Sequence, residues 1–221
     1  ITNGKDYVIL PEAKDYKRIG EKDTGLNTGG MGAVSPVNFA DNEFMKKVEE
    51  RVIKRTVEGI KKENLDYTGF IFAGLMNIEG NPFVIEYNVR MGDPETQVVI
   101  PRIKNDLLEI LLKCFENKLD EIDLNFTDGY TTTVILASNG YPESYPKGDE
   151  INNLEEDSNN KIFHAGTIFK DNKVLSNGGR VIACTGFGKN LNDALNSSYK
   201  IANKISWKNK YFRKDIGNDL K

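Results

Sequence analysis

The sequence predicts an α+β fold in which helices and antiparallel strands occupy two regions of different character. Residues 70–78 and 82–91 are two strand-like segments separated by a short turn at Glu79-Gly80-Asn81, a strong hairpin signal. One helical segment precedes this hairpin and another follows it. From Tyr130 onward, short strand-like segments alternate with turn clusters, which indicates a smaller β-rich unit.

The first region begins with a predicted strand at residues 5–10 and a polar, glycine-rich segment at residues 14–36. Asp41 is a suitable N-cap for the first helix. The apolar residues that recur at helical spacing after it are Phe44, Val48, Val52, Ile53, Val57 and Ile60. Asp106 and Glu109 form a capping-box pair that opens the second helix, DLLEILLKCFENKL.

The second region follows a polar stretch at residues 120–129 that contains few strand-forming residues. We therefore predict two domains, residues 1–125 and residues 126–221. Its expected strands are TTTVILAS, KIFHAGTIF, KVLS and RVIACTGFG, and a helix over 191–205 is expected to follow them.

Composition excludes several classes of protein. The chain has 221 residues with 30 basic and 33 acidic side chains, and no basic block supports a nucleic-acid partner. Its apolar runs are shorter than the roughly 18 residues that a membrane span needs, and we expect no signal peptide. The two cysteines lack CxxC spacing, so we expect buried thiols and a cytoplasmic location. Because the chain opens on Ile1 rather than Met, we expect a fragment of a longer protein.

The segment VIEYNVRMGDPE, residues 84–95, carries the most informative pattern. Alternate side chains of a strand share a face, so Phe83, Ile85, Tyr87 and Val89 are expected to pack against a core. The opposite face then presents Glu86, Asn88 and Arg90. A carboxylate and an amide oxygen suit a hard cation such as Mg²⁺, and an arginine suits phosphate. The alternative is a strand face that is simply solvated.

Two neighbouring features favour the metal-phosphate interpretation. If the hairpin turns around Gly80, Gly74 lies opposite Glu86, and a glycine in a strand often marks the close approach of a ligand or backbone. A second acidic pair, Asp93 and Glu95, follows the strand directly.

The segment DTGLNTGGMGA, residues 23–33, holds four glycines. It matches neither a Walker A loop nor a dinucleotide fingerprint. It is therefore either a loop whose backbone N–H groups converge on an anion or substrate, or a flexible surface loop. Lys17 and Arg18 precede it and would add positive charge. His164, the only histidine, is expected to have a structural or interdomain role.

In combination and in this order, several segments closely resemble the phosphoribosylamine–glycine ligase (glycinamide ribonucleotide synthetase) family, whose members are ATP-grasp enzymes of purine biosynthesis. The matching segments are DYKRIGEKDTGLNTGGMGAVSP, YTGFIFAGLM, VIEYNVRMGDPETQ, LASNGYP, FHAGT, SNGGRV and FRKDIG. The resemblance covers nearly the whole chain but only about the C-terminal half of the family's protein. It implies the C-terminal part of an ATP-grasp core, an antiparallel sheet with helices, followed by a small β-rich domain.

The resemblance implies that ATP, glycine and 5-phosphoribosylamine react through glycyl phosphate to glycinamide ribonucleotide, ADP and phosphate. It makes Glu86 and Asn88 ligands of Mg²⁺ or Mn²⁺, and Arg90, Asp93 and Glu95 catalytic. The implied substrate-binding residues are Lys17, Arg18, Asp23, Thr24, Gly25, Asn27, Thr28, Gly29 and Gly30. It also implies the N-terminal half of the same protein as a partner, and a transient contact with the upstream purine-pathway enzyme. The fragment alone is expected to be inactive.

Two positions depart from the expected pattern. Gly74 stands where other ATP-grasp enzymes often place a metal-binding carboxylate, and Tyr16 stands where this family often has histidine. The alternatives are an ATP-grasp ligase with a different acceptor, and a non-catalytic module that binds Mg²⁺ or a sugar phosphate.

Overall fold

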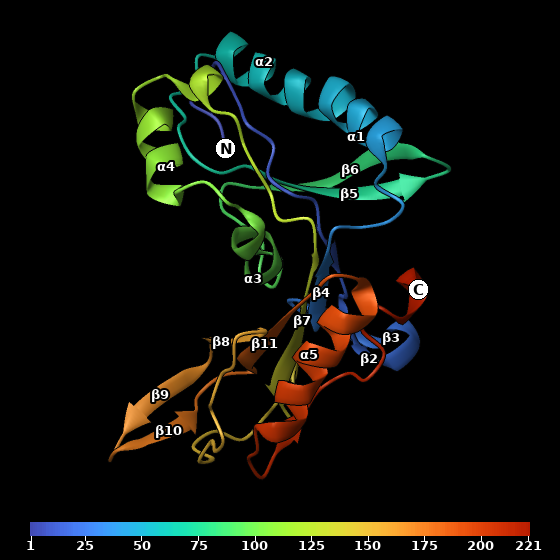
Figure 1. The fold of residues 1–221 in the computed structure, drawn as a ribbon, viewed down its shortest axis with the longest axis vertical. Coiled ribbons are helices and arrows are strands. Elements are labelled where there is room, and N and C mark those ends of the chain that lie inside the picture. Colours follow the sequence, from blue (N-terminus) through green and yellow to red (C-terminus); the bar gives the residue numbers. More distant parts are fainter. The chain divides into compact units, whose positions relative to one another are not determined.

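The computed structural model describes all residues from Ile1 to Lys221, which form two compact units (Figure 1). The first unit comprises residues 1–12, 37–92 and 102–127, and the second comprises residues 13–36, 93–101 and 128–221. The division at residue 125 stays a prediction about domains. The compact units differ from it because residues 13–36 and 93–101 belong with the C-terminal region.

In the first unit, one helical stretch forms along the predicted apolar stripe. It consists of α1 (Asn42–Val48), a π-helical segment (Glu49–Ile53) and α2 (Lys54–Lys62). The Asp41 side chain accepts a hydrogen bond from the Phe44 N–H, which confirms the predicted N-cap. Five stripe residues are buried and Ile53 is half-buried. The wider π-turn changes the phase of the stripe at that residue.

The predicted hairpin is confirmed as β5 (Phe72–Ile78) and β6 (Asn81–Asn88), which pair antiparallel. Glu79 and Gly80 at the turn both have positive φ, 50° and 72°, as a type I′ hairpin turn requires. Gly74 lies directly opposite Glu86, as the sequence predicted.

The predicted packing of the hairpin's apolar side chains against a core is wrong for this chain. Phe83, Ile85, Tyr87 and Val89 are 53%, 63%, 49% and 74% exposed. β5 and β6 form a sheet of their own with no third strand. Two strands cannot enclose the side chains on their faces, even with the helical stretch beside β6.

A small core forms around α4 (Leu107–Phe115), which precedes a 3₁₀ turn at Leu119–Glu121. Asp106 caps α4 by accepting the N–H groups of Leu108 and Glu109. The buried residues of this core are Ile1, Ile110, Cys114 and Leu119. The strand predicted at residues 5–10 is wrong, because this segment makes only one bridge, between Thr2 and Tyr7. Its apolar residues Val8 and Leu10 pack on the α4 core instead.

The second unit is built on a six-stranded antiparallel sheet with the strand order β1-β4-β7-β11-β8 and a short β12 that also pairs with β7. Its strands are β1 (Lys14–Asp15), β4 (Gly32–Ser35), β7 (Tyr130–Ser138), β8 (Asn160–His164), β11 (Arg180–Gly188) and β12 (Lys210–Tyr211). Helix α5 (Leu191–Lys204) packs on β7 and β11 (Figure 1). The sequence therefore predicted the central strands and the helix, but not that residues 14–15 and 32–35 join this sheet.

Smaller elements complete the second unit. β2 (Arg18–Gly20) and β3 (Thr24–Asn27) form one hairpin, and β9 (Thr167–Lys170) and β10 (Lys173–Ser176) form another. Short helical segments are α3 (Thr96–Val99) and 3₁₀ turns at Glu21–Asp23, Ile100–Arg102 and Asn218–Leu220. The segment KIFHAGTIF divides into β8 and β9 rather than forming one strand. No helix of the chain is both long and apolar enough to cross a membrane.

Two glycine-to-alanine variants test the packing of α5. A Cβ atom at Gly186 would lie 2.3 Å from the backbone nitrogen of Ser198 and 2.4 Å from the carbonyl oxygen of Ala194. Gly186→Ala should therefore push α5 off β11 and lower the free energy of unfolding by about 1–3 kcal/mol. Gly59→Ala in α2, where a Cβ atom meets nothing within 4 Å, should instead raise it by about 0.5–1 kcal/mol. Urea denaturation measures both values, and equal shifts would contradict the packing described.

Candidate active site

The polar face of β6 presents oxygen atoms that could bind a cation. The Glu86 side chain crosses over Gly74, where an added Cβ atom would lie 2.9 Å from the Glu86 Cγ. The Asn88 Oδ1 accepts one hydrogen bond, from the Arg90 Nη2 at 3.3 Å. The Glu86 carboxylate is exposed, and no hydrogen bond or ion pair engages it. Gly74 thus gives Glu86 room to lie across the hairpin with its oxygens available.

These oxygens fit a divalent cation of the hard class. Carboxylate and amide oxygens are the ligands that Mg²⁺ prefers, and Mg²⁺ usually keeps water or phosphate oxygens as its other ligands. No group of three or more His, Cys, Asp or Glu side chains in the chain could hold a metal ion. Glu86 and Asn88 therefore fit as a partial ligand set that a phosphate would complete.

In the second unit, the GDPE turn leads into α3. The Asp93 Oδ1 accepts hydrogen bonds from the Arg180 Nη1 and the Gln97 Nε2, both at 3.1 Å. The Glu95 carbonyl accepts the N–H groups of Val98 and Val99, which starts the helix. Glu95 itself is buried, with 7% of its surface exposed. The two acidic residues of the turn thus have different surroundings, one exposed and ion-paired and the other enclosed.

Glu95 interacts with a second buried carboxylate, Asp15, which the sequence analysis did not single out. Burial raises the pKa of Glu95 to about 7, and the negative charge of Asp15 adds to this effect. Burial also raises the pKa of Asp15, although the Lys17 Nζ lies 2.6 Å from its Oδ2. Asp15 opens the segment DYKRIGEKDTGLNTGGMGAVSP, but nothing in that segment indicates that it lies near Glu95, so only the folded structure reveals the pair.

The glycines of the loop around residues 28–31 serve packing rather than anion binding through backbone N–H groups. The Thr28 N–H donates to the Lys17 carbonyl, the Gly29 N–H to the Tyr141 hydroxyl, and the Gly30 N–H to the Thr28 Oγ1. The Met31 N–H donates to the Tyr16 carbonyl. This part of the loop therefore offers no free N–H group to an anion.

Steric contacts explain why glycines occupy positions 29 and 30. A Cβ atom at Gly29 would lie 2.8 Å from the guanidinium carbon of Arg180. One at Gly30, whose φ is 115°, would lie 2.3 Å from the Pro94 Cδ. The loop can approach Arg180 and the GDPE turn this closely only because these side chains are absent.

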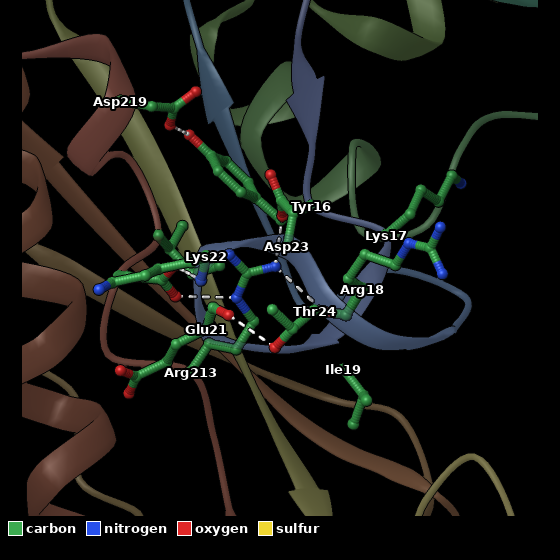
Figure 2. A network of polar contacts seen from close by, with 12 residues as sticks. Tyr16, Lys17, Arg18, Ile19, Glu21, Lys22, Asp23, Thr24, Arg213 and Asp219 are labelled. Carbon is green, nitrogen blue, oxygen red and sulfur yellow. Dashed lines mark hydrogen bonds and ion pairs between the residues drawn. The ribbon is translucent and has the colours of Figure 1, made fainter.

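The β2–β3 hairpin, which carries several predicted substrate-binding residues, is held by the buried Arg213 (Figure 2). The Arg213 Nη1 donates to the Asp23 Oδ1 at 2.8 Å and to the Arg18 carbonyl at 3.1 Å. Its Nε and Nη2 donate to Asp215. The guanidinium also lies over the Tyr16 ring, 5.4 Å from the ring centroid. The Asp23 carboxylate therefore has a structural partner.

The remaining predicted loop residues have mostly local contacts. The Thr24 hydroxyl donates to the Glu21 carbonyl and the Arg18 Nη1 donates to the Gly25 carbonyl. Asn27 is exposed at the end of β3. Whether these residues bind substrate stays a prediction.

Tyr16 and His164 each make a contact that accounts for the residue without a catalytic role. The Tyr16 hydroxyl donates to the Asp219 Oδ1 at 2.6 Å. Burial raises the Tyr16 pKa far above its usual range, so this hydroxyl stays protonated and is unsuited to acid–base work. The His164 Nδ1 lies 3.0 Å from the Thr167 Oγ1, a contact between the end of β8 and the start of β9, which follow each other in the chain.

Comparison with known proteins identifies the family. The model of the phosphoribosylglycinamide synthetase ATP-grasp (A) domain matches residues 1–96, and that of the phosphoribosylglycinamide synthetase C domain matches residues 131–219. The chain belongs to the phosphoribosylglycinamide synthetase family. The two matched regions lie on either side of the polar stretch at residues 120–129.

Individual relatives agree with this assignment. The chain is 48% identical to the bifunctional purine biosynthetic protein PUR2,5 of Pichia angusta over 98% of its own length and 28% of the relative's. It is 43% identical to phosphoribosylamine–glycine ligase of Agrobacterium fabrum, over 98% of its own length and 52% of the relative's. The crystal structure of that ligase from Thermotoga maritima superposes with a TM-score of 0.86 at 38% identity, covering 97% of this chain and 53% of that one. The chain thus spans about half the length of the single-function synthetases it matches.

The first test of the site concerns Arg213. Its replacement by methionine leaves Asp215 and Asp23 without their cation and should lower the free energy of unfolding by about 3 kcal/mol, measured by urea denaturation. Arg55→Met, at an exposed arginine of α2, is the matched control and should change stability by less than about 0.5 kcal/mol. A loss at Arg213 no larger than at Arg55 would show that the ion pairs do not hold the hairpin.

The second test concerns the pH dependence of stability. Because the pKa of Glu95 is raised in the folded protein from 4.5 to about 7, the folded state holds a proton that the unfolded chain releases. Stability should therefore fall as pH rises through this window. Glu95→Gln removes this loss, so its stability relative to the wild type should rise by up to about 3 kcal/mol between about pH 5 and pH 8. Denaturant titrations at the two pH values measure it, and a constant difference would contradict the buried, protonated state.

Proposed function

We propose that this chain carries part of a phosphoribosylamine–glycine ligase active site, namely the part that binds the transferring phosphoryl group and the amine substrate. The observation that carries the proposal is the Glu86 carboxylate, which lies unpartnered across Gly74 on a strand that the ATP-grasp domain model covers. Asn88 and Arg90 follow on the same face. Oxygen ligands beside a guanidinium fit the handling of a transferring phosphoryl group.

The reaction has two steps in this proposal. The carboxylate of glycine attacks the γ-phosphorus of ATP and releases ADP, which gives glycyl phosphate. The amine of 5-phosphoribosylamine then attacks the glycyl carbonyl and expels inorganic phosphate, with loss of one proton from the nitrogen, to give glycinamide ribonucleotide. A divalent cation, Mg²⁺ or Mn²⁺, held by Glu86 and Asn88 would offset the charge of the transferring group.

The other candidate site residues would have separate roles in binding, orientation and proton transfer. Arg90 would bind an oxygen of the transferring phosphoryl group through its guanidinium. Glu95, with a pKa of about 7, has the proton affinity to accept the proton that the amine loses. Asp93 would orient the amine. Asp23, Thr24, Gly25, Asn27 and the loop of Thr28 to Gly30, with Lys17 and Arg18, would form the surroundings of this substrate.

The exposed apolar side chains of the β5–β6 hairpin support a further part of the proposal. Several large apolar side chains that are exposed on one hairpin often mark a site that another surface covers. We infer that Phe83, Ile85 and Val89, each more than half exposed, pack against the N-terminal half of a complete ligase. The 221-residue chain alone would then lack turnover.

A Glu86 variant tests the proposed chemistry. In the protein expressed from the full reading frame that contains this chain, Glu86→Gln should lower kcat at least about 100-fold because a metal ligand acts on the transition state. Phosphate release that requires ATP, glycine and 5-phosphoribosylamine is the measurement. Glu79→Gln, in the turn of the same hairpin, is the control and should leave kcat unchanged.

The same assay separates the alternatives. Turnover with another amino acid in place of glycine would favour the alternative of an ATP-grasp ligase with a different acceptor. Full turnover by Glu86→Gln would show that the strand binds no catalytic cation and would favour a non-catalytic binding role for this part of the protein.

A further inference from the structure

Three turns of the second unit meet at the start of β11. The Tyr141 ring lies directly on Gly179, where a Cβ atom would come within 2.1 Å of the ring Cδ2. Gly166 and Gly178 touch in the same way, because a Cβ atom at Gly166 would lie 2.6 Å from the Gly178 Cα. The Ser138 N–H donates to the Gly179 carbonyl at 2.8 Å. These contacts fix the backbone immediately before Arg180.

Arg180 is held by one nitrogen of its guanidinium. The Nη1 donates to the Gly29 carbonyl at 2.8 Å, to the Asp93 carbonyl at 2.8 Å and to the Asp93 Oδ1 at 3.1 Å. The plane of the group lies against Gly29, as the close contact of a Cβ atom there shows. The side chain is 22% exposed, so its position is defined by packing as well as by hydrogen bonds.

The other edge of the same guanidinium is free. The Nε and Nη2 of Arg180 make no hydrogen bond to any residue of the chain, and neither is among the polar atoms that are buried without a partner. They are therefore open to solvent. An Nε–Nη2 edge carries two parallel N–H groups, the geometry that binds two oxygens of a phosphate or carboxylate. An arginine that is fixed on one side and open on the other is preorganised for an anion.

Tyr141 provides a second donor beside the same loop. Its hydroxyl oxygen accepts the Gly29 N–H at 3.0 Å, and its own hydrogen has no acceptor in the chain. Gly29 is thus bound through its carbonyl by Arg180 and through its N–H by Tyr141. Both side chains keep an unused N–H or O–H group next to the loop.

We propose that Arg180, through its Nε–Nη2 edge, and the Tyr141 hydroxyl bind the phosphate of a sugar phosphate substrate. The identity of this substrate as 5-phosphoribosylamine rests on the proposed function. In the proposed reaction, the glycine carboxylate attacks the phosphoryl group beside the cation that Glu86 holds. The 5′-phosphate of the sugar is therefore the substrate anion that Arg180 would bind. The Asp93 carboxylate pairs with Nη1 alone and leaves the binding edge unobstructed.

Binding of ribose 5-phosphate, a stable stand-in for the phosphoribosylamine, tests this site in the 221-residue chain. Calorimetric titration should show binding to the wild type and at least tenfold weaker binding to Arg180→Lys, which keeps the charge but loses the fork. Arg51→Lys is the matched control, since Arg51 is an exposed arginine that bonds only to Asn81, and should bind like the wild type. Ribose and glycine should not compete for the site, whereas inorganic phosphate should compete weakly.

A second measurement does not depend on a variant that must fold. In ¹⁵N-labelled wild-type chain, the Arg180 Nε–H signal should shift on addition of ribose 5-phosphate and stay in place on addition of ribose. Unchanged affinity in Arg180→Lys, an immobile Nε–H signal or no binding by the wild type would each overturn the proposal. If ribose 5-phosphate binds at Arg180 but the wild-type protein of the Glu86 experiment shows no ligase turnover, the binding site stands and the proposed reaction is rejected. If that protein turns over but ribose 5-phosphate does not bind, the reaction stands and the binding site is rejected.

Discussion

The antiparallel pairing of β4 with β7 is the interaction on which the rest of the second unit depends. Gly32 to Ser35 pair with Val134 to Thr131, which brings a segment near the start of the chain into the sheet of the C-terminal region. The pairing requires a glycine at position 32, since a Cβ atom there would lie 2.7 Å from the Thr133 carbonyl. Because β1 pairs with β4, and the β2–β3 hairpin lies between them in the chain, the position of β4 also fixes residues 14–31 in this unit.

Two arginines, Arg213 and Arg180, then fix the segments that the sheet has brought together. Arg213 joins the β2–β3 hairpin to the C-terminal segment through Asp23 and Asp215. Arg180 joins the 28–31 loop to the GDPE turn through Gly29 and Asp93. In both cases, a guanidinium satisfies carbonyl and carboxylate oxygens from segments far apart in sequence, because its several donors diverge from one planar group. The loops of the candidate site are therefore parts of a cross-linked unit rather than mobile surface chain.

The two groups of candidate site residues differ in how their chemistry arises. On β6, the properties of Glu86 and Asn88 follow from their own positions along a hairpin, with Gly74 opposite to leave room. At the GDPE turn, the raised pKa of Glu95 comes from burial and from Asp15, a residue 80 positions earlier in the chain. A strand face can be inferred from spacing, whereas a desolvated carboxylate pair exists only after folding.

The sequence by itself determined the local elements of this protein. The hairpin with Gly74 against Glu86, the Asp41 and Asp106 helix caps, the central strands and α5 all follow from spacing, turn residues and caps, which act over a few residues. The family resemblance also needed only short segments in order. Tertiary structure alone decided that residues 14–15 and 32–35 join the C-terminal sheet, that the loop glycines make room for Arg180 and Pro94, and that the hairpin's apolar side chains are exposed in this chain. Each of these depends on contacts between distant residues, which no local pattern of apolar and polar side chains encodes.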